Sequence, residues 1–110
     1  MAGFYVCQDG HAVNAVPPVD ISGTGFTSDR FKLGLYSHAS FLLQIGANNG
    51  ASVITVEECD DASGSHSTAI AFKYAKEETG SGDTLSALAD ATSTGISTHA
   101  SADSIMYLIE

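Results

Sequence analysis

The chain has 110 residues, of which 13 are Asp or Glu and four are Lys or Arg, giving a formal net charge of −9. This length suits a single domain, and the acidic balance disfavours nucleic acid and anionic membranes as partners. No apolar run approaches the roughly 20 residues needed to cross a bilayer, and the N-terminus lacks a basic leader with an apolar core. We therefore expect synthesis and assembly in the cytoplasm.

Residues 1–29 predict an extended N-terminal arm. The stretch "NAVPPVDISGTGFTSD" contains both prolines of the chain, Pro17 and Pro18, and shows little regular patterning. Each proline fixes its own φ and restricts the residue before it, which excludes a helix there. Such an arm suits a position along the surface of a neighbouring molecule.

Residues 30–110 predict one β-domain. "RFKLGLYS", "ASFLLQIGA" and "SVITVEEC" alternate apolar and polar positions with period two, which indicates strands. Asn48, Asn49 and Gly50 lie between the second and third of these segments and predict a tight hairpin, because Asn and Gly tolerate positive φ. Ile54 and Val56 are expected to face the core, opposite to Val53 and Thr55.

The second half of the domain continues the pattern. "DDASGSHS" predicts a polar turn, and "TAIAFKYAKE" predicts a half-buried strand. "TLSALADAT" fits a helix, a loop or a strand. "DSIMYLIE" predicts a strand buried on both faces, and because this pattern runs to Glu110, either the chain continues or a partner completes the strand. The expected fold is an all-β antiparallel sandwich, jelly-roll-like, or a partly open barrel.

The chain also contains two cysteines and nine aromatic residues. Cys7 and Cys59 give no disulfide framework, and we expect reduced, buried thiols, although one bridge between them stays open. Alternation along the strands assigns five aromatic side chains to the core: Phe31, Phe41, Phe72, Tyr74 and Tyr107. Tyr5 and Tyr36 have polar neighbours and are expected to contact a partner.

The residues do not predict a metal or cofactor. Cys59 and His66 stand seven apart without a second close pair, which fails zinc-ligand spacing. Asp60, Asp61 and Ser63 supply hard oxygen donors in a turn, but the run lacks the remaining positions of a calcium loop. The alternatives are a solvated acidic turn, which we favour, and a weak cation site shared with a neighbouring chain.

The residues do not predict an enzyme either. Ser65, His66 and Ser67 are adjacent in sequence, which does not produce the geometry of a catalytic triad. Glu57 and Glu58 follow each other on a strand, so their side chains point to opposite faces. We expect no catalytic residues.

The order of segments resembles a group of small virion structural proteins of tailed phages and prophages. The resemblance rests on "VPPVDISG", "SDRFKLGLYSHASFLLQIG", "ITVEECDDASGSHSTAIAFKY", "DTLSALADAT" and "ADSIMYLIE", which together span most of the chain. It implies a decoration or cement protein on the capsid surface, with the major capsid protein and further copies of itself as partners.

The alternatives are a neck or tail component and, from a different class, a glycan-binding or hydrolytic β-domain. The expected partner contacts are Tyr5, Pro17, Pro18, Asp20, Tyr36, Asp60 and Asp61.

Overall fold

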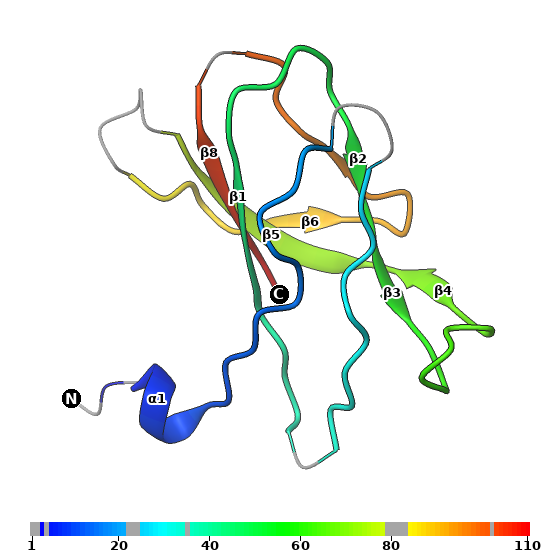
Figure 1. Cartoon of the computed structure of the whole chain (residues 1–110). Helices are drawn as coiled ribbons and strands as arrows, with labels where there is room; N and C mark the ends of the chain where they lie inside the picture. The colour runs from blue at the N-terminus through cyan, green and yellow to red at the C-terminus, as the bar shows by residue number, and fades with distance from the viewer. Residues whose placement is uncertain (1–2, 4, 22–24, 35, 79–83, 102) are drawn as a thin grey trace. The chain divides into compact units, whose positions relative to one another are not determined.

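The computed structural model describes residues 3, 5–21, 25–34, 36–78, 84–101 and 103–110. The chain divides into two compact units, Met1–Arg30 and Phe31–Glu110. The described residues of the N-terminal unit contain one helix, α1 (Val6–Asp9), and no strand (Figure 1).

Helix α1 is a single turn that the sequence did not predict. The backbone N–H groups of Gln8 and Asp9 donate to the Tyr5 carbonyl oxygen at 2.9 and 2.7 Å. The Asp9 carboxylate in turn accepts a hydrogen bond from the Tyr5 backbone N–H at 2.8 Å. This carboxylate satisfies an amide that precedes the helix and so stabilises a helical turn within the segment predicted to be an extended arm.

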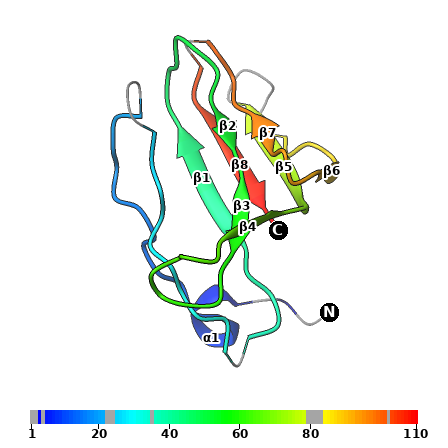
Figure 2. The ribbon, with the colours of Figure 1, turned by 90° about the vertical axis from the view of Figure 1, so that its right-hand side faces the viewer.

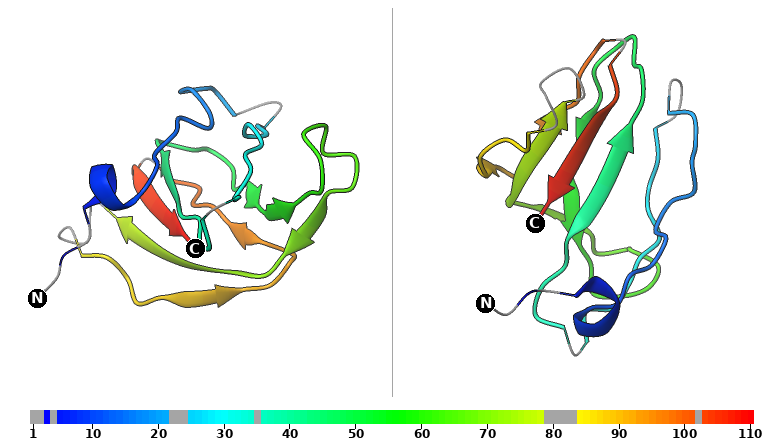
Figure 3. Two further views of the ribbon diagram at one scale, coloured as in Figure 1. Left: turned by 90° about the horizontal axis from the view of Figure 1, so that it is seen from below. Right: turned by 90° about the vertical axis from the view of Figure 1, so that its left-hand side faces the viewer.

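The described residues of the second unit form eight strands, all paired antiparallel. The largest sheet has the order β1-β8-β5-β6, and two smaller sheets pair β2 with β7 and β3 with β4. The strands are β1 (Phe41–Ile45), β2 (Val53–Ile54), β3 (Val56–Glu58), β4 (Thr68–Ile70), β5 (Phe72–Glu78), β6 (Ala89–Ala91), β7 (Ile96–Ser97) and β8 (Ile105–Ile109). The prediction of an all-β antiparallel sandwich is confirmed, and the sheets do not close into a barrel (Figure 3).

The core lies between the four-stranded sheet and the β2–β7 pair (Figure 2). Ile54 of β2 and Ile96 of β7 belong to the same buried cluster as Phe72 of β5 and Tyr107 of β8. Val53 points outward and is exposed, so the predicted alternation of this segment is confirmed. The remaining buried members of the cluster are Ile45, Ala91, Ile105 and Ile109.

Strand β8 occupies an interior position of the large sheet, between β1 and β5. Ile105, Tyr107 and Ile109 are buried, whereas Met106 and Leu108 on the outer face are half-buried. The prediction of burial on both faces therefore holds for one face only. Strands β1 and β5 flank β8 within this chain, so the backbone of the last strand is paired on both sides.

The predicted hairpin between β1 and β2 does not form, because β1 pairs with β8 and β2 pairs with β7. The connection 46–52 instead carries the chain from the large sheet to the β2–β7 pair. Gly50 does not have a positive φ, and the Asn48 backbone N–H donates to the Ser101 carbonyl oxygen at 2.8 Å. Asn48 thus contributes a long-range bond rather than a tight turn.

The strand predicted over "RFKLGLYS" is also wrong. Gly34 has a φ of 54°, and the Tyr36 backbone N–H donates to the Leu33 carbonyl oxygen at 2.8 Å, which closes a turn in the middle of the segment. Phe31 and Leu33 are exposed, so the assignment of Phe31 to the core is wrong, although its ring lies 5.7 Å from that of Phe41. Leu35, the third predicted inward residue, lies outside the described residues.

The structure also settles two smaller questions. The ambiguous segment "TLSALADAT" is extended, with Leu85 bridging to Glu77 and with β6 at its end. Cys7 and Cys59 are both free and both exposed, so the prediction of buried thiols is wrong. Cys59 directly follows β3, where the chain leaves the sheet and enters a solvated loop.

Gly95 provides a direct test of how the β6–β7 turn packs on β2. Its φ is +87°, and an added Cβ would clash with the Ile54 carbonyl oxygen and approach Thr55 Cγ2 to 2.9 Å. We expect Gly95→Ala to lower the free energy of unfolding by about 3 kcal/mol, through backbone strain together with the clash. Urea denaturation measures the change. The matched control is Gly50→Ala, since a Cβ there meets open space; equal losses in both variants would contradict the described packing.

Candidate functional site

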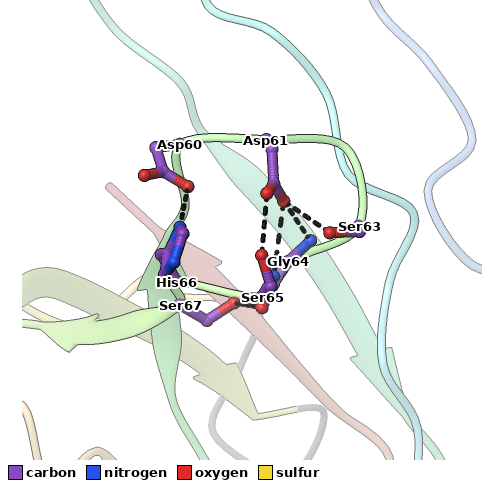
Figure 4. A network of polar contacts seen from close by, with 7 residues as sticks. All are labelled: Asp60, Asp61, Ser63, Gly64, Ser65, His66 and Ser67. Atoms are coloured by element: carbon purple, nitrogen blue, oxygen red, sulfur yellow. Dashed lines mark hydrogen bonds and ion pairs between the residues drawn. The ribbon is translucent and has the colours of Figure 1, made fainter.

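The densest group of polar side chains in the second unit lies in the acidic loop, residues 60–67, which joins β3 to β4. The two strands pair with Val56 opposite Ile70 and Glu58 opposite Thr68, so the loop closes a hairpin. Figure 4 shows seven of its eight residues, which contact one another through side chains and through the backbone of Gly64. The prediction that this run is a polar turn between strands is confirmed.

Asp61 organises the loop. Its Oδ1 atom accepts hydrogen bonds from Ser63 Oγ and Gly64 N at 2.8 Å and from Ser65 N at 3.3 Å. Its Oδ2 atom accepts a bond from Ser65 Oγ at 2.8 Å. The hydroxyl of Ser65, then that of Ser63, and the backbone N–H groups of Ser65 and Gly64 lower the pKa of Asp61 to about 2. Gly64, with a φ of 72°, makes the tight turn that aims these donors at the carboxylate.

Asp60 and His66 form a second contact across the loop. His66 Nδ1 lies 2.9 Å from Asp60 Oδ1, and both side chains are mostly exposed. An exposed pair of this kind contributes little to stability, because water screens it and ordering the two side chains costs entropy. Its effect is to hold the two ends of the loop together.

Asp60, Asp61 and His66 also place potential ligand atoms within 4.8 Å of one another. Asp61, however, already accepts four hydrogen bonds, and His66 Nδ1 contacts Asp60. Three of the four bonds fall on Asp61 Oδ1 and one on Oδ2, and together they fix the turn before any partner arrives. The geometry is that of a preformed polar surface.

The serines of the loop do not pair with its histidine. Ser65 Oγ donates to Asp61 Oδ2, and Ser67 Oγ donates to the Gly64 carbonyl oxygen at 2.7 Å. Both hydroxyls are thus engaged by other acceptors, so the loop does not present the nucleophile–base hydrogen bond that acyl transfer needs.

The other expected contact residues lie elsewhere. In the N-terminal unit Tyr5 precedes α1, and Pro17, Pro18 and Asp20 are exposed. In the second unit Tyr36 is exposed at the turn that follows Gly34. The structure brings Asp60 and Asp61 together and leaves Tyr36 in a separate loop.

A second polar cluster, which sequence reasoning missed, joins the connections 46–52 and 98–104. Thr98 is buried, and its Oγ1 accepts hydrogen bonds from Ser52 N at 2.8 Å and from Asn48 Nδ2 at 3.5 Å. The Thr98 backbone N–H donates to the Ser52 carbonyl oxygen at 2.8 Å. Asn48 Nδ2 also donates to the carbonyl oxygen of His99 at 3.3 Å.

His99 extends this cluster into the core. Its Nε2 atom lies 2.9 Å from the Gly46 carbonyl oxygen and 3.0 Å from that of Asp103. Since both partners only accept, Nε2 carries a proton. Nδ1 lies 3.2 Å from the hydroxyl of the buried Tyr107, which also accepts the His99 backbone N–H at 3.0 Å. The only sequence signal was an isolated His in a polar stretch, which does not reveal such long-range partners.

No family model, no curated protein and no solved structure matches this chain. Within the described residues, helices of the length and apolarity required to span a bilayer are absent.

The low pKa of Asp61 predicts that the folded loop becomes less stable at low pH. A carboxyl whose pKa falls from 3.8 to about 2 on folding stabilises the folded loop fully above pH 4 and loses that contribution as the pH drops toward 2. We expect the Asp61 carboxyl carbon to titrate near pH 2 in an NMR experiment. Ser65→Ala should raise this midpoint, because it removes the largest cause of the shift.

The control is Ser67→Ala, whose hydroxyl bonds to Gly64 and not to Asp61. If Asp61 titrated near 3.8 in the folded chain, or if both serine variants moved its midpoint equally, the described network would be wrong.

The Thr98 hydroxyl gives a stability test of the second cluster. Thr98→Val keeps the shape of the side chain but leaves the Ser52 N–H without its side-chain acceptor, and we expect a loss of about 1–3 kcal/mol in the free energy of unfolding. Thr55→Val changes an exposed threonine in the same way and should cost less than about 0.5 kcal/mol. Urea denaturation of both variants provides the measurement, and a neutral Thr98→Val would show that the bond contributes nothing.

Proposed function

We propose that this chain is a virion structural protein of a tailed phage, a decoration or cement protein that binds the capsid shell and strengthens it. The observation that carries the proposal is the exposure of large apolar side chains on the N-terminal unit. Tyr5, Val13 and Val19 are 63%, 61% and 56% exposed. When a neighbouring protein covers apolar surface of this kind, the free energy of the system falls, which favours binding.

The backbone of the N-terminal unit supports the same role. Between α1 and residue 21 the described chain has no regular secondary structure, and Pro17 and Pro18 hold it in extended conformations. A segment that is already extended loses less conformational entropy on docking than a flexible one would. It can therefore lie along capsid subunits at a modest entropic cost.

The charge of the chain fits the outside of a particle. With 13 acidic and four basic residues, the protein is repelled by packaged DNA and attracted by basic surface on a shell. The acidic loop, with Asp60 and Asp61 in a preformed turn, offers such a shell a rigid contact that needs little reordering.

The mechanism proposed is added interface. Each copy would bridge adjacent capsid subunits through its N-terminal unit, and the symmetry of a shell would repeat that modest contact many times. Shell stability would then increase without any chemical step, so no cofactor is required.

Binding to particles tests this proposal. We expect the double variant Val13→Ser, Val19→Ser to bind assembled capsids of the parent phage at least about tenfold more weakly, because two side chains lose their apolar contact. Cosedimentation of purified chain with capsids gives the affinity. The matched control is Val53→Ser, which removes an equally exposed valine from β2 in the other unit and should bind as the wild type does.

Copy number separates the shell role from a neck or tail role. A shell protein is present in hundreds of copies per particle, whereas a neck or tail protein forms a ring of few copies. Quantitative mass spectrometry of purified particles counts them. If the chain were absent from particles, or if capsid binding survived the double variant intact, the proposal would fail.

A further inference from the structure

The two edges of the four-stranded sheet differ in how they are protected. Edge strand β6 has three residues and carries Asp90, whose carboxylate pairs with Lys73 of β5. Edge strand β1 has five residues, Phe41–Ile45, with no charge, no Pro and no Gly. Short length, charge and Pro are the usual devices that keep a sheet edge from pairing with another chain. Strand β6 has two of them and β1 has none.

Charge is distributed unevenly across the same sheet. Residues 33–56, with β1 near the middle, contain no Asp, Glu, Lys or Arg, and neither does β8. Charged residues of the sheet are therefore confined to β5 and β6, on the opposite side. In a chain of net charge −9, the β1–β8 half of the sheet is a region where two like-charged molecules can meet with little repulsion.

The outer face beside this edge is apolar. Leu42 is 67% exposed, and it lies opposite Leu108 in the antiparallel register. Gln44 lies opposite Met106 in the next row, and its Nε2 donates to Ser104 Oγ at 2.7 Å. Leu42, Met106 and Leu108 thus form a small apolar patch that ends at the open edge of β1.

We propose that β1 is a self-association edge, which pairs antiparallel with β1 of a second copy to form a continuous eight-stranded sheet. An antiparallel pair of identical strands is symmetric by construction, so the contact is isologous and closes as a dimer. A register centred on Leu43 sets Phe41 opposite Ile45 of the partner subunit on the inner face. On the outer face it sets Leu42 opposite Gln44 of the partner subunit, so the two apolar patches join across the axis.

Charge complementarity selects a second copy as the occupant. A basic partner would be drawn to the acidic regions of the chain and would gain nothing from a neutral strand. A second copy carries the same net charge of −9, so the uncharged β1 edge is where main-chain hydrogen bonds and apolar contact outweigh repulsion. This inference concerns the purified chain and does not depend on the capsid proposal.

Sedimentation equilibrium of the full chain, with Leu42→Lys as the variant, tests the edge. We expect the wild type to be in a concentration-dependent monomer–dimer equilibrium. Leu42→Lys should raise the dissociation constant at least about tenfold, because it removes apolar contact and places two like charges near the axis. The control is Val53→Lys, since Val53 is 65% exposed in a strand of another sheet; it adds the same charge and should dimerise as the wild type does.

Hydrogen exchange separates a second copy from other occupants. In the dimer, the outward amides of residues 41–45 should be more protected at high than at low protein concentration. Protection that does not change with concentration would mean that the chain itself covers β1, and it would overturn the proposal. A wild type that stays monomeric, or equal weakening by Leu42→Lys and Val53→Lys, would overturn it too.

Discussion

The hydrogen-bonded tie around Thr98 is the interaction on which the rest of the second unit depends. Two of the connections between the four-stranded sheet and the β2–β7 pair are bonded to each other: residues 46–52 lead from β1 to β2, and residues 98–104 lead from β7 to β8. Thr98 bonds to Ser52 through both its backbone and its hydroxyl, and Asn48 bonds to Ser101. Because both connections cross between the same two layers, bonding them to each other holds the layers in one arrangement. Irregular backbone crossing the end of a core is costly unless its polar groups are paired in this way.

The sequence was informative about which segments are strands and poor on how they pair. Alternation of Ile54 and Val56 against Val53 and Thr55 is a local property of an extended chain, and it survives into the fold. Pairing is a long-range property. Asn48 and Gly50 predicted a hairpin between β1 and β2. In the structure β1 pairs instead with β8, an apolar strand about sixty residues away in the sequence. The glycine in "RFKLGLYS" was overlooked as a turn residue because its apolar neighbours matched the strand pattern.

The two polar sites also differ in whether their contacts are local or long-range in the sequence. The loop around Asp61 was predictable, since its donors come from Ser63, Gly64 and Ser65, within four residues of the carboxylate. The cluster around His99 was not, since its ring contacts Gly46 and Tyr107, which only the fold brings near. Tyr107 was assigned to the core from its alternation, correctly, but alternation says nothing about where a buried hydroxyl finds its partner.

The arrangement of charge shows how the proposed self-association can occur despite the high net charge of the chain. A net charge of −9 keeps isolated molecules apart, but in physiological salt that repulsion is screened beyond about 8 Å. Contact is then decided locally, by the surface that two copies present to each other. Among the described strands, β1 pairs on one side only and carries no charge, whereas the other edge strand, β6, carries Asp90. A lysine at position 42 would protect this edge against pairing with another chain. It would not disturb the core, because the Leu42 side chain is already exposed. The absence of charge along that edge is therefore better explained by a contact than by solubility, and a self-contact is the case in which neutrality matters most.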